Sequence, residues 1–213
     1  MQKIVDGKTV ALIGTGPSLA LEQVATARRR GFSLAGVNNV WEIVPDLRVL
    51  YCCNAGWWGR YWCPALRDHP ASKWTQSREA ADKYGLNWTA ERNAPGLSTN
   101  PSYIHHGHGS GYSLLNLVYL MGAARILLLG YDLRYASDYC GKARRVGSSP
   151  RHFFGEYPPE LQHWPSVKVK DGVHVELVDL YRSVADQGLV EIINCSPGSA
   201  IDCFPRMSIE EVT

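Results

Sequence analysis

Short apolar runs alternate with amphipathic segments along most of the chain. The apolar runs predict strands near residues 10–13, 33–37, 46–52, 125–130 and 190–194. Apolar residues at helical spacing predict helices over about residues 19–30, 77–84, 112–121 and 175–188. Strands that are separated by helices form βαβ units with a mostly parallel sheet. The pattern therefore predicts an α/β protein with a Rossmann-like three-layer fold.

Two segments depart from this alternation. Residues 54–100 form a polar and aromatic stretch that we interpret as an aromatic-rich insertion, with tryptophans that include Trp57, Trp58, Trp62, Trp74 and Trp88. Residues 135–170 are rich in Gly, Pro, Ser and basic residues, which favours a lid or loop. At 213 residues the chain is long enough for one full domain, so we expect a single Rossmann-like domain over residues 1–213.

Composition excludes several classes of protein. The formal net charge of +2 gives no reason to expect electrostatically driven DNA binding. No apolar run approaches the roughly 20 residues that span a membrane, and the N-terminus lacks a signal-peptide core. The six cysteines include no Cys-x-x-Cys pair, so we expect free thiols and no zinc site. These features favour a cytoplasmic protein without a membrane partner.

The first predicted strand ends in Gly14-Thr15-Gly16-Pro17-Ser18, and a helix follows. A strand, a glycine turn and a helix leave backbone N–H groups unpaired where the helix dipole favours an anion such as a nucleotide phosphate. The alternative is a plain strand-to-helix turn. The loop lacks the Gly-Lys-Ser/Thr of a P-loop, and it lacks the third glycine and the acidic residue about 20 positions on that a dinucleotide site requires.

Further polar residues follow the other predicted strands. Because ligands bind at the carboxyl edge of a parallel sheet, these loops predict a nucleotide pocket there. Asp132 would bind a ribose or base, or would cap the following turn. Ser196 and Ser199 would close the pocket, or would shape the C-terminal turn. The candidates in these loops, besides the glycine loop, are Asn38, Asn39, Asn54, Asp132, Ser196 and Ser199.

Histidines offer a second kind of chemistry. His106 and His108 could share one face of an extended segment and bind a metal, but no nearby carboxylate completes a ligand set. A polar loop that lines the nucleotide site and a plain surface loop are the other interpretations, and we expect no metal. His152 could act as a general base, or it could pack between aromatic residues.

Several motifs together resemble a known group. Ile13 to Leu19 resembles the Gly-x-Gly-Pro-Ser opening of bacterial sialyltransferases of the Campylobacter type and of the archaeal hydroxymethylpterin diphosphokinase-like family. Asn38, the Ser110-Gly111 helix start and the Gly-Tyr-Asp ending at Asp132 are similar to further motifs of that group. The whole chain also resembles a short protein found in phages and prophages, which shares Lys73 to Gln76, His152 to Gly155 and Ile193 to Ala200.

The resemblance implies a metal-independent transferase that uses a nucleotide-activated donor and needs no other cofactor. Its general base would be His152, with Arg151 and Arg145 neutralising the departing phosphate. The chain contains no Asp-x-Asp pair of the kind that holds a divalent ion in many nucleotide-sugar enzymes. The residues expected to hold the nucleotide are Gly14, Thr15, Gly16, Pro17, Ser18, Asn38, His108, Gly109, Ser110 and Gly111.

The leading hypothesis is therefore a glycosyltransferase of phage origin, located in the host cytoplasm. Its acceptor would be a modified nucleobase in DNA or a surface glycan. One alternative is an ATP-dependent diphosphokinase-like enzyme, which would need Mg²⁺ and carboxylates such as Asp132 and Glu156 to hold it. Another is a non-catalytic nucleotide-binding or phage assembly protein, since a fold alone does not determine function. The aromatic-rich segment and the related transferases favour a homo-oligomer.

Overall fold

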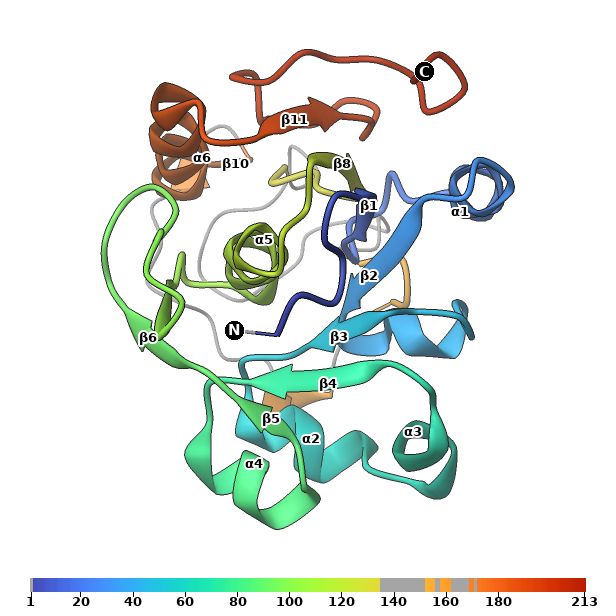
Figure 1. Cartoon of the computed structure of the whole chain (residues 1–213), viewed down its shortest axis with the longest axis vertical. Helices are drawn as coiled ribbons and strands as arrows, with labels where there is room; N and C mark the ends of the chain where they lie inside the picture. Colours follow the sequence, from blue (N-terminus) through green and yellow to red (C-terminus); the bar gives the residue numbers. More distant parts are fainter. Residues whose placement is uncertain (1, 135–151, 156–157, 162–168, 171) are drawn as a thin grey trace.

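The centre of the molecule is an all-parallel sheet of seven strands (Figure 1). The computed structural model describes residues 2–134, 152–155, 158–161, 169–170 and 172–213. The strand order is β11-β8-β1-β2-β3-β4-β5. The strands are β1 (Thr9–Ile13), β2 (Ser33–Val37), β3 (Val49–Tyr51), β4 (Ser72–Thr75), β5 (Asn87–Trp88), β8 (Arg125–Leu129) and β11 (Glu191–Asn194).

Helices and two small sheets complete the fold. β6 (Ala90–Arg92) pairs with β7 (Tyr103–His105), and β9 (Val169–Lys170) pairs with β10 (Val173–His174). The helices are α1 (Leu21–Arg29), α2 (Ala55–Tyr61), α3 (Pro64–Asp68), α4 (Arg78–Tyr84), α5 (Ser110–Leu120) and α6 (Val175–Gln187), with 3₁₀ turns η1 (Asn38–Glu42) and η2 (Pro159–Leu161). Within the described ranges, no helix is both long enough and apolar enough to cross a membrane.

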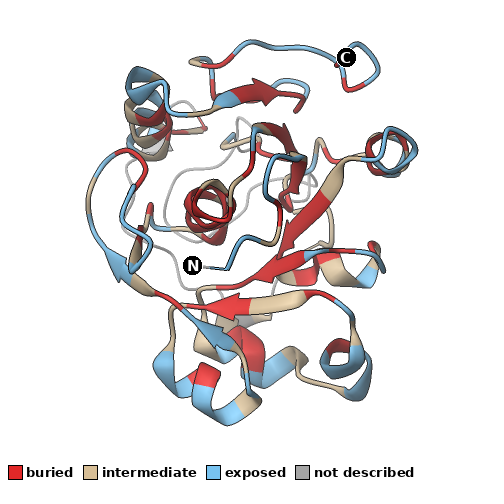
Figure 2. Cartoon of the chain, in the orientation of Figure 1, coloured by how far each residue is buried: buried red, intermediate tan, exposed pale blue. Residues whose placement is uncertain are grey.

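The sheet is buried on both faces, as Figure 2 shows for its central strands. Alternate residues of a strand point to opposite faces. Val10 and Leu12 of β1 belong to a core cluster that includes residues of α5 and α6. Ala11 and Ile13 of the same strand belong to a second cluster, which includes residues of α1, α2, α3 and α4. The predicted three-layer α/β fold is therefore confirmed.

Capping residues explain where several of the predicted helices begin and end. Ser77 is the N-cap residue of α4, and its side chain accepts a hydrogen bond from the Ala80 N–H. Gly85, with a φ of 66°, is the C-cap residue of the same helix. α6 ends at Gly188 with a φ of 59°. A residue in the left-handed conformation commonly ends a helix, and glycine adopts this conformation readily because it has no Cβ. α1 begins at Leu21, slightly later than the periodicity predicts, because Ala20 has an extended backbone.

Residues 54–100 contribute more regular structure than the sequence predicts. Besides the expected helix, this segment supplies β4 and β5 to the main sheet. Its tryptophans mostly form the chain's own core: Trp57 and Trp58 are buried, and their indole N–H groups donate to Asn39 Oδ1 (2.8 Å) and to the Cys52 carbonyl (3.1 Å). Trp88 is 39% exposed. The homo-oligomer stays a prediction. It was based partly on this aromatic-rich segment, whose tryptophans are mostly buried within the chain.

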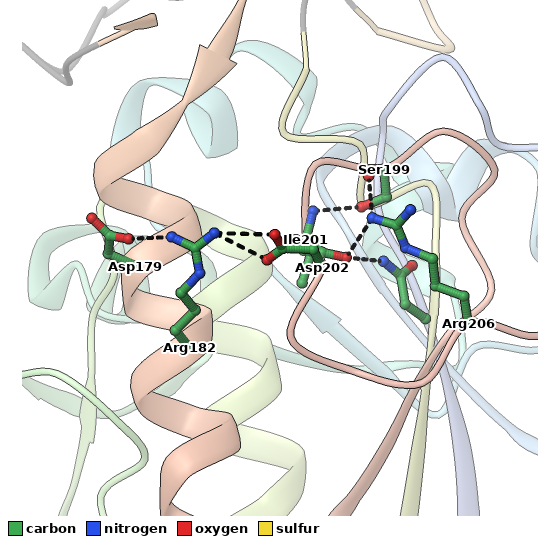
Figure 3. Close-up of polar contacts among 7 residues, drawn as sticks. Asp179, Arg182, Ser199, Ile201, Asp202 and Arg206 are labelled. Atoms are coloured by element: carbon green, nitrogen blue, oxygen red, sulfur yellow. Dashed lines mark hydrogen bonds and ion pairs between the residues drawn. The ribbon is translucent and has the colours of Figure 1, made fainter.

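The chain after β11 folds back beside that strand. Arg206 donates to the backbone carbonyls of Ser199 (2.8 Å) and Ile201 (3.2 Å), as Figure 3 shows. Arg182 on α6 bonds to both Asp179 and Asp202 in the same view. These exposed ion pairs contribute little to stability, whereas the bonds of Arg206 satisfy backbone carbonyls and so define the path of this loop.

Burial of His174 predicts a loss of stability in mild acid. His174 lies at the end of β10 and is 7% exposed, and burial lowers its pKa to about 4. The unfolded chain binds a proton here near pH 6.5, whereas the native state resists protonation down to about pH 4. The native state should therefore lose about 2 kcal/mol through this group between pH 7.5 and pH 5. Urea unfolding at both pH values should show this loss in the wild type and a smaller one in His174→Gln, and equal losses would contradict the assignment.

Candidate functional site

The strand order changes direction between β1 and β8. From β1 the chain continues outward through β2, β3, β4 and β5, and it then returns to place β8 on the other side of β1. In open parallel sheets, ligands bind at the carboxyl edge of the strands, near the point where the strand order reverses. The loops here are residues 14–18 after β1 and residues 130–132 after β8.

The glycine loop at residues 14–18 packs directly against the end of β8. The Gly14 N–H donates to the Leu129 carbonyl (2.8 Å), and the Gly16 N–H donates to the Gly130 carbonyl (2.9 Å). A Cβ on Gly14 would lie 2.5 Å from the Gly130 oxygen. Neither Gly14 nor Gly16 has a positive φ, so close backbone approach is what requires a glycine at these positions. The loop thus extends the β1–β8 pairing beyond the strands.

The Asp132 carboxylate packs against the glycine loop. It accepts hydrogen bonds from the Ser18 N–H (3.2 Å to Oδ1) and from the Ser18 hydroxyl (2.9 Å to Oδ2). A Cβ on Gly16 would lie only 1.8 Å from Oδ2. Burial raises the pKa of Asp132, and the two bonds from Ser18 oppose that shift. The Asp132 side chain therefore links the loop after β8 to the glycine loop through Ser18, the residue that follows Pro17.

His152 reaches the same loop from far along the chain. Its Nδ1 lies 3.3 Å from Thr15 Oγ1, and the neighbouring Phe153 N–H donates to the Thr15 carbonyl (2.8 Å). The structure therefore brings the predicted general base to the predicted nucleotide loop. Arg151 and Arg145, the predicted partners of His152, lie outside the described residues.

The start of α5 also lies at the carboxyl edge of the sheet. Ser110 Oγ accepts a hydrogen bond from the Cys53 N–H (3.1 Å) and donates to Cys53 Sγ (3.2 Å). The Gly111 carbonyl accepts a hydrogen bond from the buried Tyr131 hydroxyl (3.2 Å). Gly109 is the N-cap residue, and it has no side chain that could accept a hydrogen bond from the first N–H groups of α5. The positive end of the helix dipole is therefore not capped by a side chain of this residue.

The contacts of Cys53 and Tyr131 with α5 are features of the site that the sequence analysis did not predict. Burial raises the pKa of the Cys53 thiol, so it is held in its neutral form beside Ser110. Tyr131 was visible only as the middle residue of the Gly-Tyr-Asp motif, which does not reveal its contact with α5. Both positions depend on packing between elements that are distant in sequence.

The histidines before α5 show no metal cluster. His108 has a φ of 56°, and its ring centroid lies 5.1 Å from that of His106. His106 Nδ1 lies 3.8 Å from a carboxylate oxygen of Glu91, which is too long for a hydrogen bond. Among the described residues, no group of three His, Cys, Asp or Glu side chains is arranged to hold a metal ion.

The predicted asparagines have different environments. Asn38 follows β2 with a φ of 50°, and its buried Oδ1 accepts no hydrogen bond within the described part of the chain. Asn39 bonds to Glu42 and Trp57, and Asn54 caps α2 by accepting from the Gly56 N–H (2.7 Å). Asn38 Oδ1 is therefore an unsatisfied acceptor within the described residues, whereas the side chains of Asn39 and Asn54 have structural partners.

Ser196 and Ser199 use their hydroxyl groups within the chain. Ser196 Oγ donates to the Leu128 carbonyl (3.0 Å) and accepts from the Tyr131 N–H (2.9 Å). Ser199 Oγ donates to the Tyr131 carbonyl (2.6 Å) and accepts from the Ile201 N–H (3.1 Å). Both side chains are buried. These contacts favour the second interpretation of the two serines, in which they shape the C-terminal turn.

The site thus combines a histidine, a carboxylate and an uncapped helix start at the carboxyl edge of one sheet. Such an arrangement can bind an anion at the helix start, accept donor groups at Asp132 and Asn38, and transfer a proton through His152. Comparisons with protein-family models, curated proteins and solved structures found no match to this chain.

Proposed function

We propose that this chain is a metal-independent transferase that uses a nucleotide-activated donor, with a sugar as the transferred group. The observation that carries the proposal is the contact of His152 with Thr15 of the glycine loop, at the carboxyl ends of β1 and β8. A titratable imidazole at this edge is what a hydroxyl acceptor needs for deprotonation. The resemblance to sialyltransferases supports the same reaction class, and the resemblance to phage proteins favours a modified nucleobase or a surface glycan as the acceptor.

In this proposal the donor lies across the carboxyl edge. The uncapped N–H groups at the start of α5 neutralise the leaving phosphate, and Asn38 Oδ1 accepts a hydrogen bond from the nucleoside. In the tautomer whose Nδ1–H donates to Thr15 Oγ1, Nε2 would be the atom that takes the proton from the acceptor hydroxyl. Thr15 is then a positioning residue that sets the tautomer and orientation of the imidazole.

The diphosphokinase-like alternative is less well supported. Phosphoryl transfer from ATP uses Mg²⁺ that is held by carboxylates. Asp132, the candidate carboxylate among the described residues, already accepts two bonds from Ser18. Glu156, the other candidate, lies outside the described residues.

A thermal-shift screen tests the proposal. The purified protein is heated with CMP, UDP, GDP, ADP and ATP and with their sugar conjugates, each with Mg²⁺ and with EDTA. A ligand that binds only the native state raises the melting temperature by mass action. We expect a shift with one nucleotide class that EDTA leaves unchanged. A shift with ATP and Mg²⁺ alone would favour the kinase, and no shift with any nucleotide would contradict nucleotide binding.

His152→Ala should separate catalysis from binding. Loss of a general base lowers kcat by about 100-fold or more. The nucleotide Kd should change by less than about threefold, because the imidazole acts on the acceptor. Thr15→Val, which removes one hydroxyl, should lower kcat by a smaller factor and leave KM unchanged. Equal losses of nucleotide binding and turnover in His152→Ala would contradict the role as general base.

A further inference from the structure

Three of the four N–H groups of the glycine loop, at residues 14–18, already donate hydrogen bonds within the chain. The N–H groups of Gly14, Gly16 and Ser18 donate to Leu129, to Gly130 and to the Asp132 side chain, respectively. Pro17 has no N–H group. A phosphate cradle needs several N–H groups that converge on an empty space. Here they converge on the end of β8.

Asp132 occupies the place that an anion would take. Its carboxylate contacts both the N–H and the hydroxyl of Ser18, and it lies against Gly16 where a Cβ would be. A phosphate that approaches the Ser18 N–H would meet this carboxylate of like charge, and because Asp132 is half-buried the electrostatic repulsion is stronger there than in water. The loop is therefore closed to phosphate by the chain's own side chain.

The same carboxylate can still accept a neutral ligand group. A carboxylate has about four acceptor positions, and the Asp132 carboxylate accepts from the N–H and the hydroxyl of one other residue, Ser18, among the described residues. Asp132 is half-buried, so part of the residue remains accessible to a ligand. A hydroxyl or amino group is the ligand chemistry that such a site favours.

We infer that Asp132 is a specificity residue, which keeps phosphate out of the glycine loop and accepts a hydroxyl group of the ligand there. This inference rests on the proposed function for the identity of the ligand, a nucleoside or sugar hydroxyl. The glycine motif suggests that this loop binds the phosphate of the donor. In our inference the loop instead binds the uncharged part of the donor, and the phosphate lies elsewhere on the carboxyl edge of the sheet.

The experiment uses inorganic phosphate as the probe. In Asp132→Ala, the space against Gly16 and both donors of Ser18 become available to an anion. About 20 mM phosphate should raise the melting temperature of this variant by about 3 °C more than that of the wild type, relative to chloride at equal ionic strength. In ¹⁵N-labelled protein, the Ser18 amide signal should shift with phosphate in Asp132→Ala and stay unchanged in the wild type.

Asp132→Asn is the matched control, because it keeps the shape of the side chain and removes its charge. It should show no phosphate-dependent shift of the Ser18 amide, since the amide group still fills the space. A Ser18 amide that responds to phosphate equally in the wild type and in Asp132→Ala would overturn the inference. So would an Asp132→Ala protein that folds and gains no response.

A second set of measurements, with nucleotides in place of phosphate, distinguishes a failure of this inference from a failure of the proposed function. If no nucleotide binds to the wild type but Asp132→Ala gains phosphate binding, the proposed function fails and phosphate exclusion stands. If a nucleotide binds, its parent nucleoside should shift the wild-type Ser18 amide as strongly as the nucleotide does. A shift that requires the phosphate group would overturn the inference while the proposed function stands.

Discussion

Gly16→Ala is expected to destabilise the native state by about 3 kcal/mol or more, the upper range for overpacking. The new Cβ would lie 1.8 Å from Asp132 Oδ2 and 2.5 Å from the Gly130 carbonyl oxygen. The second contact is with backbone, which cannot rotate away as a flexible side chain can. Relief would therefore require the loops after β1 and β8 to separate, which breaks the bond from the Gly16 N–H to Gly130.

Gly59→Ala is the matched control for this substitution. Gly59 lies inside α2, it is exposed, and the nearest atom to its Cβ would be the Tyr84 hydroxyl at an ordinary 3.5 Å. Alanine should stabilise this helix by about 0.5–1 kcal/mol. Urea unfolding of both variants measures the difference, and a Gly16→Ala protein as stable as the wild type would contradict the close packing of the two loops.

Asn116→Ala is expected to cost about 3–5 kcal/mol, because it removes a buried side chain that completes three backbone hydrogen bonds. Asn116 lies on α5 and is fully buried. Its Oδ1 accepts from the N–H groups of Ser98 (2.9 Å) and His105 (2.7 Å), and its Nδ2 donates to the Ser98 carbonyl (3.0 Å). Alanine would leave these groups without partners and would open a cavity.

The position of Asn116 links this loss to the candidate site. The asparagine holds the segment around Ser98 and the strand β7 against α5, whose first turn contacts Cys53 and Tyr131. Asn93→Ala, at an exposed asparagine, is the control and should change the free energy of unfolding by less than about 0.5 kcal/mol. Chemical denaturation of both variants is the measurement, and similar midpoints would show that the buried amide contributes little.

The central strands were the most predictable part of the fold. Ile126 to Leu129 of β8 is a continuous apolar run, and such a run is typical of a parallel strand that is covered on both faces. β4 and β5 were missed, since Ser-Lys-Trp-Thr and Asn-Trp lack that signal. They belong to the sheet because β3 offers β4 a parallel partner and β4 in turn offers one to β5, and such pairing depends more on context than on propensity.

The candidate site was predictable as a location and less so as a set of contacts. Polar residues after parallel strands had to meet at one edge, and the structure brings together the loops of Thr15, Ser110 and Asp132 there. Their partners could not be predicted, because Asp132 meets Ser18 across 114 positions of sequence and His152 meets Thr15 across 137. Ser196 and Ser199 were candidates only because a free hydroxyl and a bonded one look alike in a sequence.

The sequence by itself therefore determined the α/β class, the central strands and the edge at which the polar loops gather, because hydrophobic periodicity and glycine turns act over a few residues. The tertiary structure alone decided how the glycine loop is used. Two backbones approach so closely that only glycine fits, and the carboxylate of Asp132 fills the space between them. A contact of this kind depends on the three-dimensional path of two distant segments, which no local pattern encodes.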